Sequence, residues 1–338
     1  MTTAGPYRHL LALGDDVGLL EHAEGALPRR EAGYCVDDAA RLVVCACREP
    51  GPPPLRTLAD RCLALVRHAV EPDGRCRNRL GYDRRWRDDP GLGDWWGRAV
   101  WALGEASVAH PCAGTRFGAG RAFVRAAVAR SPHRRALAYA ALGAVAVLVA
   151  EPADEVAAAL LRDAVRAVGR PAAGAWPWPE ARLGYANAVL PEALIAGGAA
   201  LGDEEAVADG CALLAWLVAT ETRAGHFSVT PAAGWGPGEP RPGFDQQPLE
   251  VAHLASACTR AFAVTGEAGW RAAVARAAAW FTGANDVGVA LADPETWGCA
   301  DGLESAGVNR NQGAESTLAL VSVWQCTRAL GLPWPCPP

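Results

Sequence analysis

The chain alternates between two kinds of segment. Some segments are rich in Ala, Leu and Val and repeat apolar residues at the three- and four-residue spacing of a helix, whereas those between them are rich in Gly, Pro, Trp and Asp. No run alternates β-branched and polar residues between turns, so no strand ladder is predicted. The helical pattern predicts helices at about 36–49, 55–70, 94–110, 118–130, 133–150, 153–168, 187–200, 203–221, 247–265, 268–283 and 313–330.

The predicted connections differ in length in a regular way. Long loops are expected at about 71–93, 169–186, 222–246 and 284–312, and short turns lie between them, for example near 201–203. In a stack of helix hairpins this alternation places the short turns at one end and the long loops at the other. Long loops in a compact domain usually carry function.

Six segments begin a helix directly after a loop or turn, and their starts are about 40–65 residues apart, which is one helix pair and a loop. Six hairpins of this kind close into a ring. We therefore predict a single all-α domain over residues 1–338, an (α/α)6 toroid. The six segments are GYCVDDAAR (33–41), GDWWGRAVW (93–101), SPHRRALAY (131–139), GYANAVLPEAL (184–194), FDQQPLEVAH (244–253) and NRNQGAEST (309–317).

Polar residues gather in the first turn of these helices. Capping of free N–H groups explains Ser131 followed by Pro132. Capping does not require the adjacent Asp37 and Asp38, and it does not explain the two larger clusters. We therefore predict a polar site at the loop end. The larger clusters are Gln246, Gln247 and Glu250, and Asn309, Asn311, Gln312 and Glu315.

Composition narrows the class of protein. The 338 residues are 51% hydrophobic and 20% charged, as in a globular protein. The net charge is −5 and no basic stripe stands out, so we expect no nucleic-acid partner. The first residues lack the basic and apolar regions of a signal peptide, and the apolar run at 136–150 is too short to span a bilayer. The expectation is a cytoplasmic protein without a membrane span.

The eleven cysteines include no CxxC pair, and an odd number without a signal peptide favours reduced thiols. We expect most of them to be small buried hydrophobic residues and the site to hold no metal. The alternative is a zinc site in which Cys299 and Cys326 meet a histidine.

Thirteen tryptophans are a further signal. Several lie in or beside the long loops, where they can either pin the loops or offer flat surfaces to a ligand with apolar faces and polar edges, such as a sugar. The others, such as Trp101 and Trp216, follow a helical pattern and are predicted to be core. The loop tryptophans are Trp86, Trp95, Trp96, Trp176, Trp178, Trp235 and Trp297.

Carboxylates at the loop end suggest glycoside chemistry, in which one carboxyl group donates a proton and another activates water or attacks. We favour Asp38 and Glu250. Asp38 has Asp37 beside it, and a like charge raises a carboxyl pKa, whereas Glu250 lies one turn behind two glutamines. For each carboxylate the alternative is a cap or an arginine partner, such as Arg41 four residues after Asp37. The other candidates are Asp37, Asp94, Glu315, Glu180, Asp245 and Asp301.

Further residues are candidates for substrate binding. Arg98, like Arg310, can hold an anionic group or pair with a neighbouring acid. Among the scattered histidines, His226 in a loop is favoured. No nucleotide-binding, nucleophile-elbow or HExxH motif appears, so no cofactor is expected. The predicted substrate-binding set is Trp96, Arg98, Trp178, Glu180, Asn187, His226, Trp235, Asp245, Gln246, Gln247, Asn311 and Gln312.

These motifs resemble a bacterial family of the six-hairpin glycosidase-like superfamily, whose members occur alone or joined to glycosyltransferases. The resemblance runs in order along nearly the whole chain. It departs at Ala39, Trp96 and Ala186, where the family has polar residues, which leaves open a changed substrate or a lost activity. The matching elements are GDDVGLLEHA (14–23), GYCVDDAAR, GDWWGRAVWALG (93–104), AWPWPEARLGYANAVLPEALI (175–195), GHFSVT (225–230), GFDQQPLE (243–250) and WGCADGLESAGVNRNQGAEST (297–317).

The resemblance implies the toroid and a saccharide or sugar conjugate as ligand. The leading hypothesis is an intracellular carbohydrate-active enzyme, a glycoside hydrolase or related glycan-processing enzyme. The second is a non-catalytic saccharide-binding partner of a glycosyltransferase. The third is a peptide or terpenoid cyclase on the same toroid, although Cys35 stands where the terpene cyclase motif has an acid.

Overall fold

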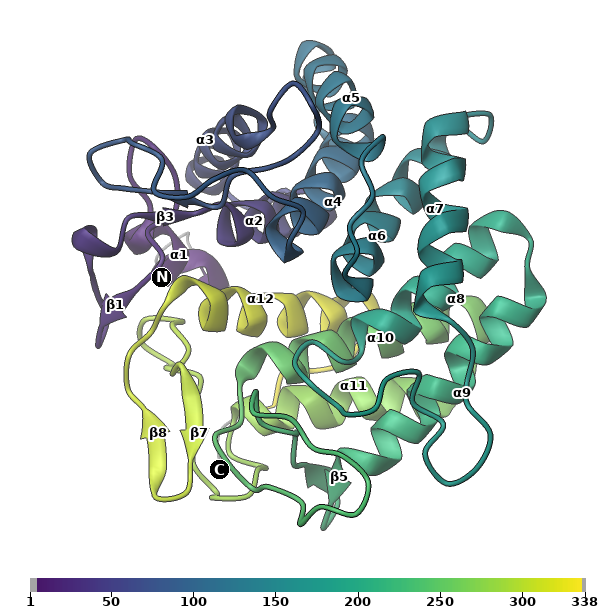
Figure 1. Ribbon diagram of the computed structural model, residues 1–338. Coiled ribbons are helices and arrows are strands. Elements are labelled where there is room, and N and C mark those ends of the chain that lie inside the picture. The colour runs from purple at the N-terminus through teal and green to yellow at the C-terminus, as the bar shows by residue number, and fades with distance from the viewer. Residues whose placement is uncertain (1–4, 336–338) are drawn as a thin grey trace.

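The computed structural model describes residues 5–335, and within them the chain is mainly helical (Figure 1). Every predicted helix is present, most within a few residues of the expected bounds, and the short α1 and two 3-10 turns, Gly5–Tyr7 and Arg30–Ala32, are additional. The helices are α1 (Arg8–Leu13), α2 (Val36–Arg48), α3 (Pro53–Ala69), α4 (Asp94–Ala109), α5 (Ala113–Ala127), α6 (Arg134–Ala150), α7 (Glu155–Val168), α8 (Val189–Leu201), α9 (Glu204–Thr220), α10 (Pro248–Thr265), α11 (Ala268–Phe281) and α12 (Ala314–Ala329).

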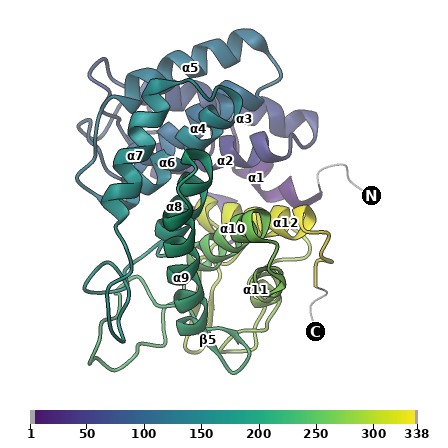
Figure 2. The ribbon, with the colours of Figure 1, turned by 90° about the vertical axis from the view of Figure 1, so that its right-hand side faces the viewer.

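The helices form two concentric rings. The even-numbered helices from α2 to α12 each pack against the next, and α12 packs against α2 to close the inner ring. Helices α3, α5, α7, α9 and α11 each pack outside the preceding inner helix, and α1 packs against α12 (Figures 1 and 2). The predicted (α/α)6 toroid is confirmed.

Small residues let the inner helices approach closely. A Cβ atom on Gly97 of α4 would lie 2.1 Å from the carbonyl oxygen of Ala136 in α6, and one on Gly104 would lie 2.4 Å from that of Gly143. Neighbouring inner helices therefore touch backbone to backbone, which a larger residue would prevent. The apolar run at 136–150 lies in α6 and is mostly buried, as predicted. No helix in the described part of the chain has the length and apolar character needed to cross a membrane.

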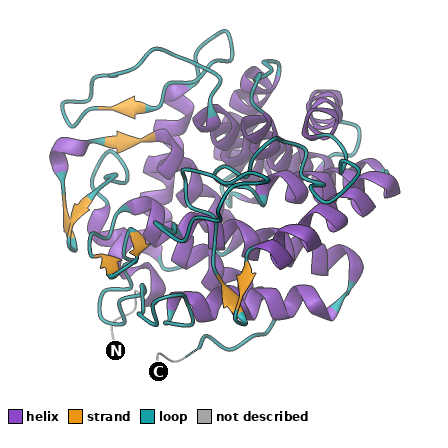
Figure 3. Ribbon diagram, turned by 60° about the horizontal axis from the view of Figure 1, so that its bottom comes forward, coloured by secondary structure: helices purple, strands orange, loops and turns teal. Residues whose placement is uncertain are grey.

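Four two-stranded antiparallel ribbons lie in the loops that precede inner helices (Figure 3). The sequence pattern did not predict them, because strands of two or three residues are too short to show alternation. These loops lead into the N-termini of inner helices. The long loops therefore lie at one end of the toroid. The ribbons pair β1 (Ala23–Glu24) with β2 (Leu27–Pro28), β3 (Tyr34–Cys35) with β4 (Arg79–Leu80), β5 (Thr222–Arg223) with β6 (His226–Phe227), and β7 (Gly302–Glu304) with β8 (Gly307–Asn309).

Candidate functional site

Acidic residues occupy the first turns of several inner helices. Asp37 and Asp38 begin α2, Asp94 begins α4, Glu250 lies in the first turn of α10 and Glu315 in that of α12. Carboxylates are favoured at helix N-termini by the helix dipole. The loop end of the ring therefore gathers the predicted carboxylates, but their partners differ.

Arg41 joins the starts of α2 and α12. One of its terminal nitrogens binds Asp38 and the other lies 2.6 Å from Oε2 of Glu315. The Asp38 side chain is 4% exposed, whereas that of Glu315 is 42% exposed. The two carboxylates therefore flank one guanidinium. The alternative pairing of Arg41 with Asp37 does not occur, because Arg41 turns toward Asp38 and α12.

Asp37 faces Arg98 of α4 instead, with Nη1 of Arg98 3.1 Å from Oδ1 of Asp37. This contact is an ion pair without hydrogen-bond geometry. Arg98 is buried, donates from Nη2 to the hydroxyl of Tyr139 at 2.6 Å and lies over the ring of that tyrosine. Arg98 therefore pairs with Asp37 and not with its helix neighbour Asp94.

The Tyr139 hydroxyl also lies 2.9 Å from Nε2 of His253 in α10. Since the hydroxyl accepts from Arg98, its own hydrogen is available to Nε2, which assigns the proton of a neutral His253 to Nδ1. Burial and the charges of Arg98, Arg41 and Arg48 lower the pKa of His253 well below its usual value. A chain of contacts thus runs from Asp37 at the loop end to a neutral imidazole inside the ring.

Burial raises the pKa of Asp38 to about 7. Arg41 opposes this shift, and Glu315, Glu21 and Asp37 add to it in that order. The expected effect of the neighbouring Asp37 on the pKa is therefore present but small beside desolvation. A carboxyl pKa raised toward neutral pH is what a proton donor requires.

A small cavity of about 50 Å³ lies inside the ring. Its walls include Arg41, Arg98, Trp101 and His253. Leu249 and further residues of α10 and α12 complete its lining. The cavity has room for little more than a water molecule.

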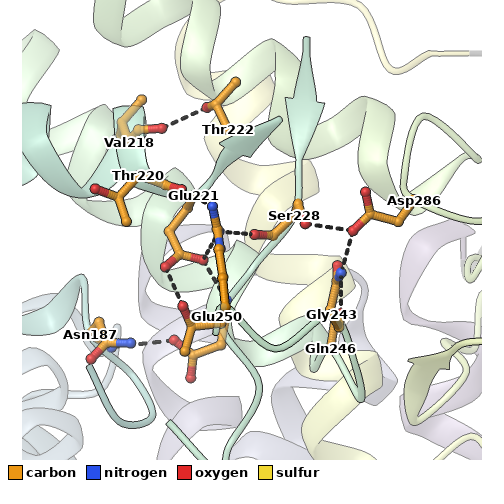
Figure 4. Close-up of polar contacts among 12 residues, drawn as sticks. Asn187, Val218, Thr220, Glu221, Thr222, Ser228, Gly243, Gln246, Glu250 and Asp286 are labelled. Carbon is orange, nitrogen blue, oxygen red and sulfur yellow. Dashed lines mark hydrogen bonds and ion pairs between the residues drawn. The ribbon is translucent and has the colours of Figure 1, made fainter. Parts of the chain in front are cut away.

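Glu250, the other favoured catalytic residue, lies among different partners. Its carboxylate accepts hydrogen bonds from the backbone N–H groups of Ala186 and Asn187, the latter at 3.3 Å. Figure 4 shows it beside Asn187 and Glu221. Burial is the main reason why the pKa of Glu250 is raised to about 7. Within the described residues no hydrogen bond joins Glu250 to Asp38, and the hydrogen bonds of Glu250 hold the loop before α8.

Asn187 and Glu180 also stabilise this loop. The Asn187 side chain accepts from the N–H of Gly184 and donates to its carbonyl, both at 3.0 Å. Arg135 of α6 donates to Asn187 at 3.2 Å and to Glu180 at 2.8 Å. Asn187 and Glu180, both predicted to bind substrate, thus form their hydrogen bonds within the protein.

Gln246 and His226 meet at Asp286. Nε2 of His226 lies 2.8 Å from Oδ1 of Asp286, and Ser228 donates to Oδ2 at 2.6 Å. Gln246, which is buried, donates to Gly243 and to Asp286 (Figure 4). His226 and Ser228 both bind the carboxylate and not each other, so the cluster is no nucleophile–base pair and ties two loops together.

The tryptophan prediction is wrong at two positions. Trp96 is fully buried and its indole N–H donates to the carbonyl of Ala126 at 3.3 Å, so it fills the space between α4 and α5. Trp178 is 2% exposed and stacks on Trp216 of α9. Both rings are therefore part of the core and are not available to a ligand.

Trp235 is partly buried on Trp176, with ring centroids 5.4 Å apart, and donates to the carbonyl of Glu239 at 2.9 Å. This ring therefore pins one long loop to another. Among the predicted glutamine and asparagine ligands, Asn311 accepts from the N–H of Gly25 at 3.0 Å, which fastens the β1–β2 turn.

The other residues predicted for catalysis or substrate binding are Gln312, Asp245, Gln247 and Asp94. Gln312 contacts the side chains of Thr296 and Asp293, each at 3.1 Å, so it is engaged in the loop before α12. Asp245 is exposed and Gln247 half-buried. Asp94 is half-buried and forms a hydrogen bond with Tyr185, and burial together with this carboxylate raises the pKa of that tyrosine.

Sequence reasoning missed Tyr139 and His253 as site residues. Both lie within the six helix-start segments, yet each is further into its helix than the first turn where we looked. The signal that could have found them is a polar side chain in the apolar stretch of a predicted inner helix, since Tyr139 and His253 lie among buried residues of α6 and α10.

One group of potential metal ligands occurs in the described residues. Glu21, Cys35 and Asp38 have ligand atoms within 4.8 Å of one another. Burial raises the pKa of the Cys35 thiol well above its usual value, and the thiol donates to Oδ1 of Asn78 at 3.2 Å. The alternative zinc pair forms no such group within residues 5–335, and the sulfur of Cys299 instead donates to the carbonyl of Ala300.

Several solved structures have a fold similar to that of this chain. No family model matches the sequence, and neither does any curated protein sequence. Among solved structures, a sugar epimerase from a ruminal bacterium is similar with a TM-score of 0.72 and 11% identity, over 96% of this chain and 95% of that one. The cellobiose 2-epimerase of Bacillus thermoamylovorans has a TM-score of 0.71 and 10% identity, over 95% of each chain.

An α-1,6-mannanase of Salegentibacter sp. HEL1_6 is also similar, with a TM-score of 0.59 and 11% identity over 96% of each chain. That structure is an inactive variant, with two consecutive aspartates replaced by asparagine, in complex with α-1,6-mannotriose. The chain thus shares the (α/α)6 toroid fold of these structures. At these identities the likeness establishes the fold and leaves the activity to the site.

Proposed function

We propose that this protein is a carbohydrate-active enzyme whose site is the loop end of the ring, and that it acts as a glycoside hydrolase through Asp38 and Glu315. The observation that carries the proposal is the placement of these two carboxyl groups on either side of Arg41. One is buried with a raised pKa and the other is exposed, which matches the division between proton donor and base or nucleophile.

The roles follow from exposure and hydrogen bonding. Glu315 reaches solvent and is available to activate water or attack the anomeric carbon. Asp38 supplies the proton to the leaving oxygen, and because Arg41 covers it, binding of the glycoside must move that arginine. Within the described residues, Oδ1 of Asp37 and Nε of Arg41 have no hydrogen-bond partner. A sugar hydroxyl can satisfy both, since it donates and accepts.

The similar structures support the substrate class. They include sugar epimerases and a mannanase, and the mannanase variant that is inactive lacks two consecutive aspartates. In this chain Asp37 and Asp38 are consecutive and begin an inner helix. The proposal replaces Glu250 by Glu315 as the partner of Asp38, because Glu250 is committed to the loop before α8.

A second candidate is non-catalytic saccharide binding. It is favoured by the pairing of Asp37, Asp38 and Glu315 with arginines and by the apolar residues at Ala39, Trp96 and Ala186. Association with a glycosyltransferase and a cytoplasmic location remain predictions.

The test is product release from oligosaccharides, including α-1,6-mannotriose and cellobiose, with chromatography that also separates epimers. We expect wild type to release sugars, and Asp38→Asn and Glu315→Gln to lose activity by at least about a hundredfold. The control is Glu205→Gln, which breaks a surface pair with Arg170 on the outer ring. Full activity of Asp38→Asn overturns the assignment. If a sugar stabilises wild type but is not turned over, the result supports the binding role. If the products are epimers of the substrate, the protein is an epimerase and not a hydrolase.

A further inference from the structure

A second cavity, of about 420 Å³, lies at the opposite end of the toroid from the long loops. The C-terminal parts of α2, α10 and α12 line it together with Glu192 of α8. The connections at this end are short, so helices rather than loops form its walls. Its volume lies in the range of small-molecule sites.

Three arginines line this cavity, Arg48, Arg260 and Arg328. Arg328 lies 3.4 Å from Glu49. Arg48 lies over the ring of Trp101, and its hydrogen bonds are long contacts to the hydroxyls of Ser322 at 3.5 Å and Ser256 at 3.4 Å. No ion pair or hydrogen bond joins Arg260 to another of residues 5–335. Burial raises the pKa of Glu192, and the charge of Arg260 is the largest influence that opposes this rise. Positive charge therefore remains available to a ligand.

Two buried side chains in the cavity wall carry oxygens without partners. Glu192 is 1% exposed and accepts from Ser256 at 2.9 Å through Oε1, but its Oε2 has no hydrogen bond from a described residue. Gln325 is 6% exposed and donates to the carbonyl of Cys45 at 2.9 Å, whereas its Oε1 is unpartnered. Buried acceptors without donors are costly, so these two oxygens call for hydroxyl or water donors.

We propose that this cavity binds a sugar phosphate, with the phosphate on Arg48, Arg260 and Arg328 and the sugar hydroxyls donating to Glu192 and Gln325. Guanidinium groups bind phosphate through paired, charge-assisted hydrogen bonds. The carboxylates of Glu49 and Glu192 offset part of the positive charge. A hydroxyl-bearing ligand is therefore favoured over a bare anion.

Arginines near helix C-termini also stabilise the helix dipole. This role accounts for Arg48 and Arg328, which lie in the last turns of α2 and α12. It does not account for the unpartnered oxygens of Glu192 and Gln325. These two acceptors distinguish a ligand site from arginines that only cap helices.

The experiment is calorimetric titration of the protein with glucose 6-phosphate, inorganic phosphate and glucose. We expect glucose 6-phosphate to bind more tightly than either fragment. Arg260→Met should weaken glucose 6-phosphate binding at least about tenfold, because one charge-assisted contact is lost. Gln325→Leu should abolish the preference for the sugar phosphate over inorganic phosphate while phosphate still binds.

The matched control is Arg166→Met, in a cavity of about 370 Å³ that arginines also line, between α7 and α9. Circular dichroism checks that each variant is folded. Binding unchanged by Arg260→Met, an equal loss in Arg166→Met, or no binding by wild type overturns the proposal. Asp38→Asn should leave this binding intact, so failure of the loop-end assignment would be recognised separately.

Discussion

The Tyr139 hydroxyl lies 2.9 Å from Nε2 of His253, which joins α6 to α10 across the interior of the ring. The same hydroxyl accepts from Arg98, so one oxygen serves two buried groups. Tyr139, Arg98 and His253 are all buried. Removal of the hydroxyl would leave a charged donor and an imidazole nitrogen unpaired together.

Tyr139→Phe should therefore destabilise the protein by about 1–3 kcal/mol, the cost of buried polar groups left without partners. Urea denaturation followed by circular dichroism measures the change. The control is Tyr82→Phe, at a position that is 48% exposed, where we expect less than about 0.5 kcal/mol. Equal effects at the two tyrosines would contradict the buried network.

Stability should fall as the pH rises from about 4.5 to above 7, because burial raises the pKa of Glu250 and of Glu221 to about 7. A carboxyl group with a raised pKa in the folded state binds its proton more tightly there than in the unfolded chain. Its contribution is present below the unfolded pKa and is lost as the pH passes the folded one.

For Glu250 the raised pKa corresponds to a loss of folding stability of about 3 kcal/mol between low and high pH. Denaturant titrations of wild type and Glu250→Gln at pH 5 and pH 8 test it. The variant should lose less stability than wild type between the two pH values. An equal or greater loss in the variant would show that ionisation of Glu250 costs the fold nothing.

Ala186→Gly should stabilise the fold by roughly 0.5–1 kcal/mol. Ala186 has a φ of 47°, in the left-handed region where a Cβ is unfavourable, and its N–H is held by Glu250. Ala188→Gly is the control, since its φ of −68° is helical and glycine there gains nothing. Thermal melts of both variants decide the matter, and a lower melting temperature for Ala186→Gly would be the contrary result.

Gly97→Ala should destabilise by at least about 2 kcal/mol, because the new methyl group meets the backbone of α6, which cannot turn aside. Gly269→Ala in α11 has open space around its Cβ and should be neutral or stabilising by up to about 1 kcal/mol. Denaturation midpoints of the two variants provide the comparison. If Gly97→Ala were as stable as wild type, the close approach of α4 and α6 would be wrong.

The sequence by itself determined the helices and their order. Apolar spacing marks each helix over many residues, and the alternation of long and short connections, with the six helix starts, indicates six hairpins. Asp37, Asp38 and Glu315 could be predicted as loop-end residues because their place depends only on where a helix begins.

The tertiary structure alone decided which side chains meet. Arg41 and Glu315 lie 274 residues apart and touch because α12 closes the ring on α2. Asp37 turns to Arg98, Glu250 to the loop before α8, and Trp96 into the core, although each is a helix-start residue. These choices depend on how each helix is rotated about its axis, and that rotation is set by packing of the whole ring, which local spacing does not encode.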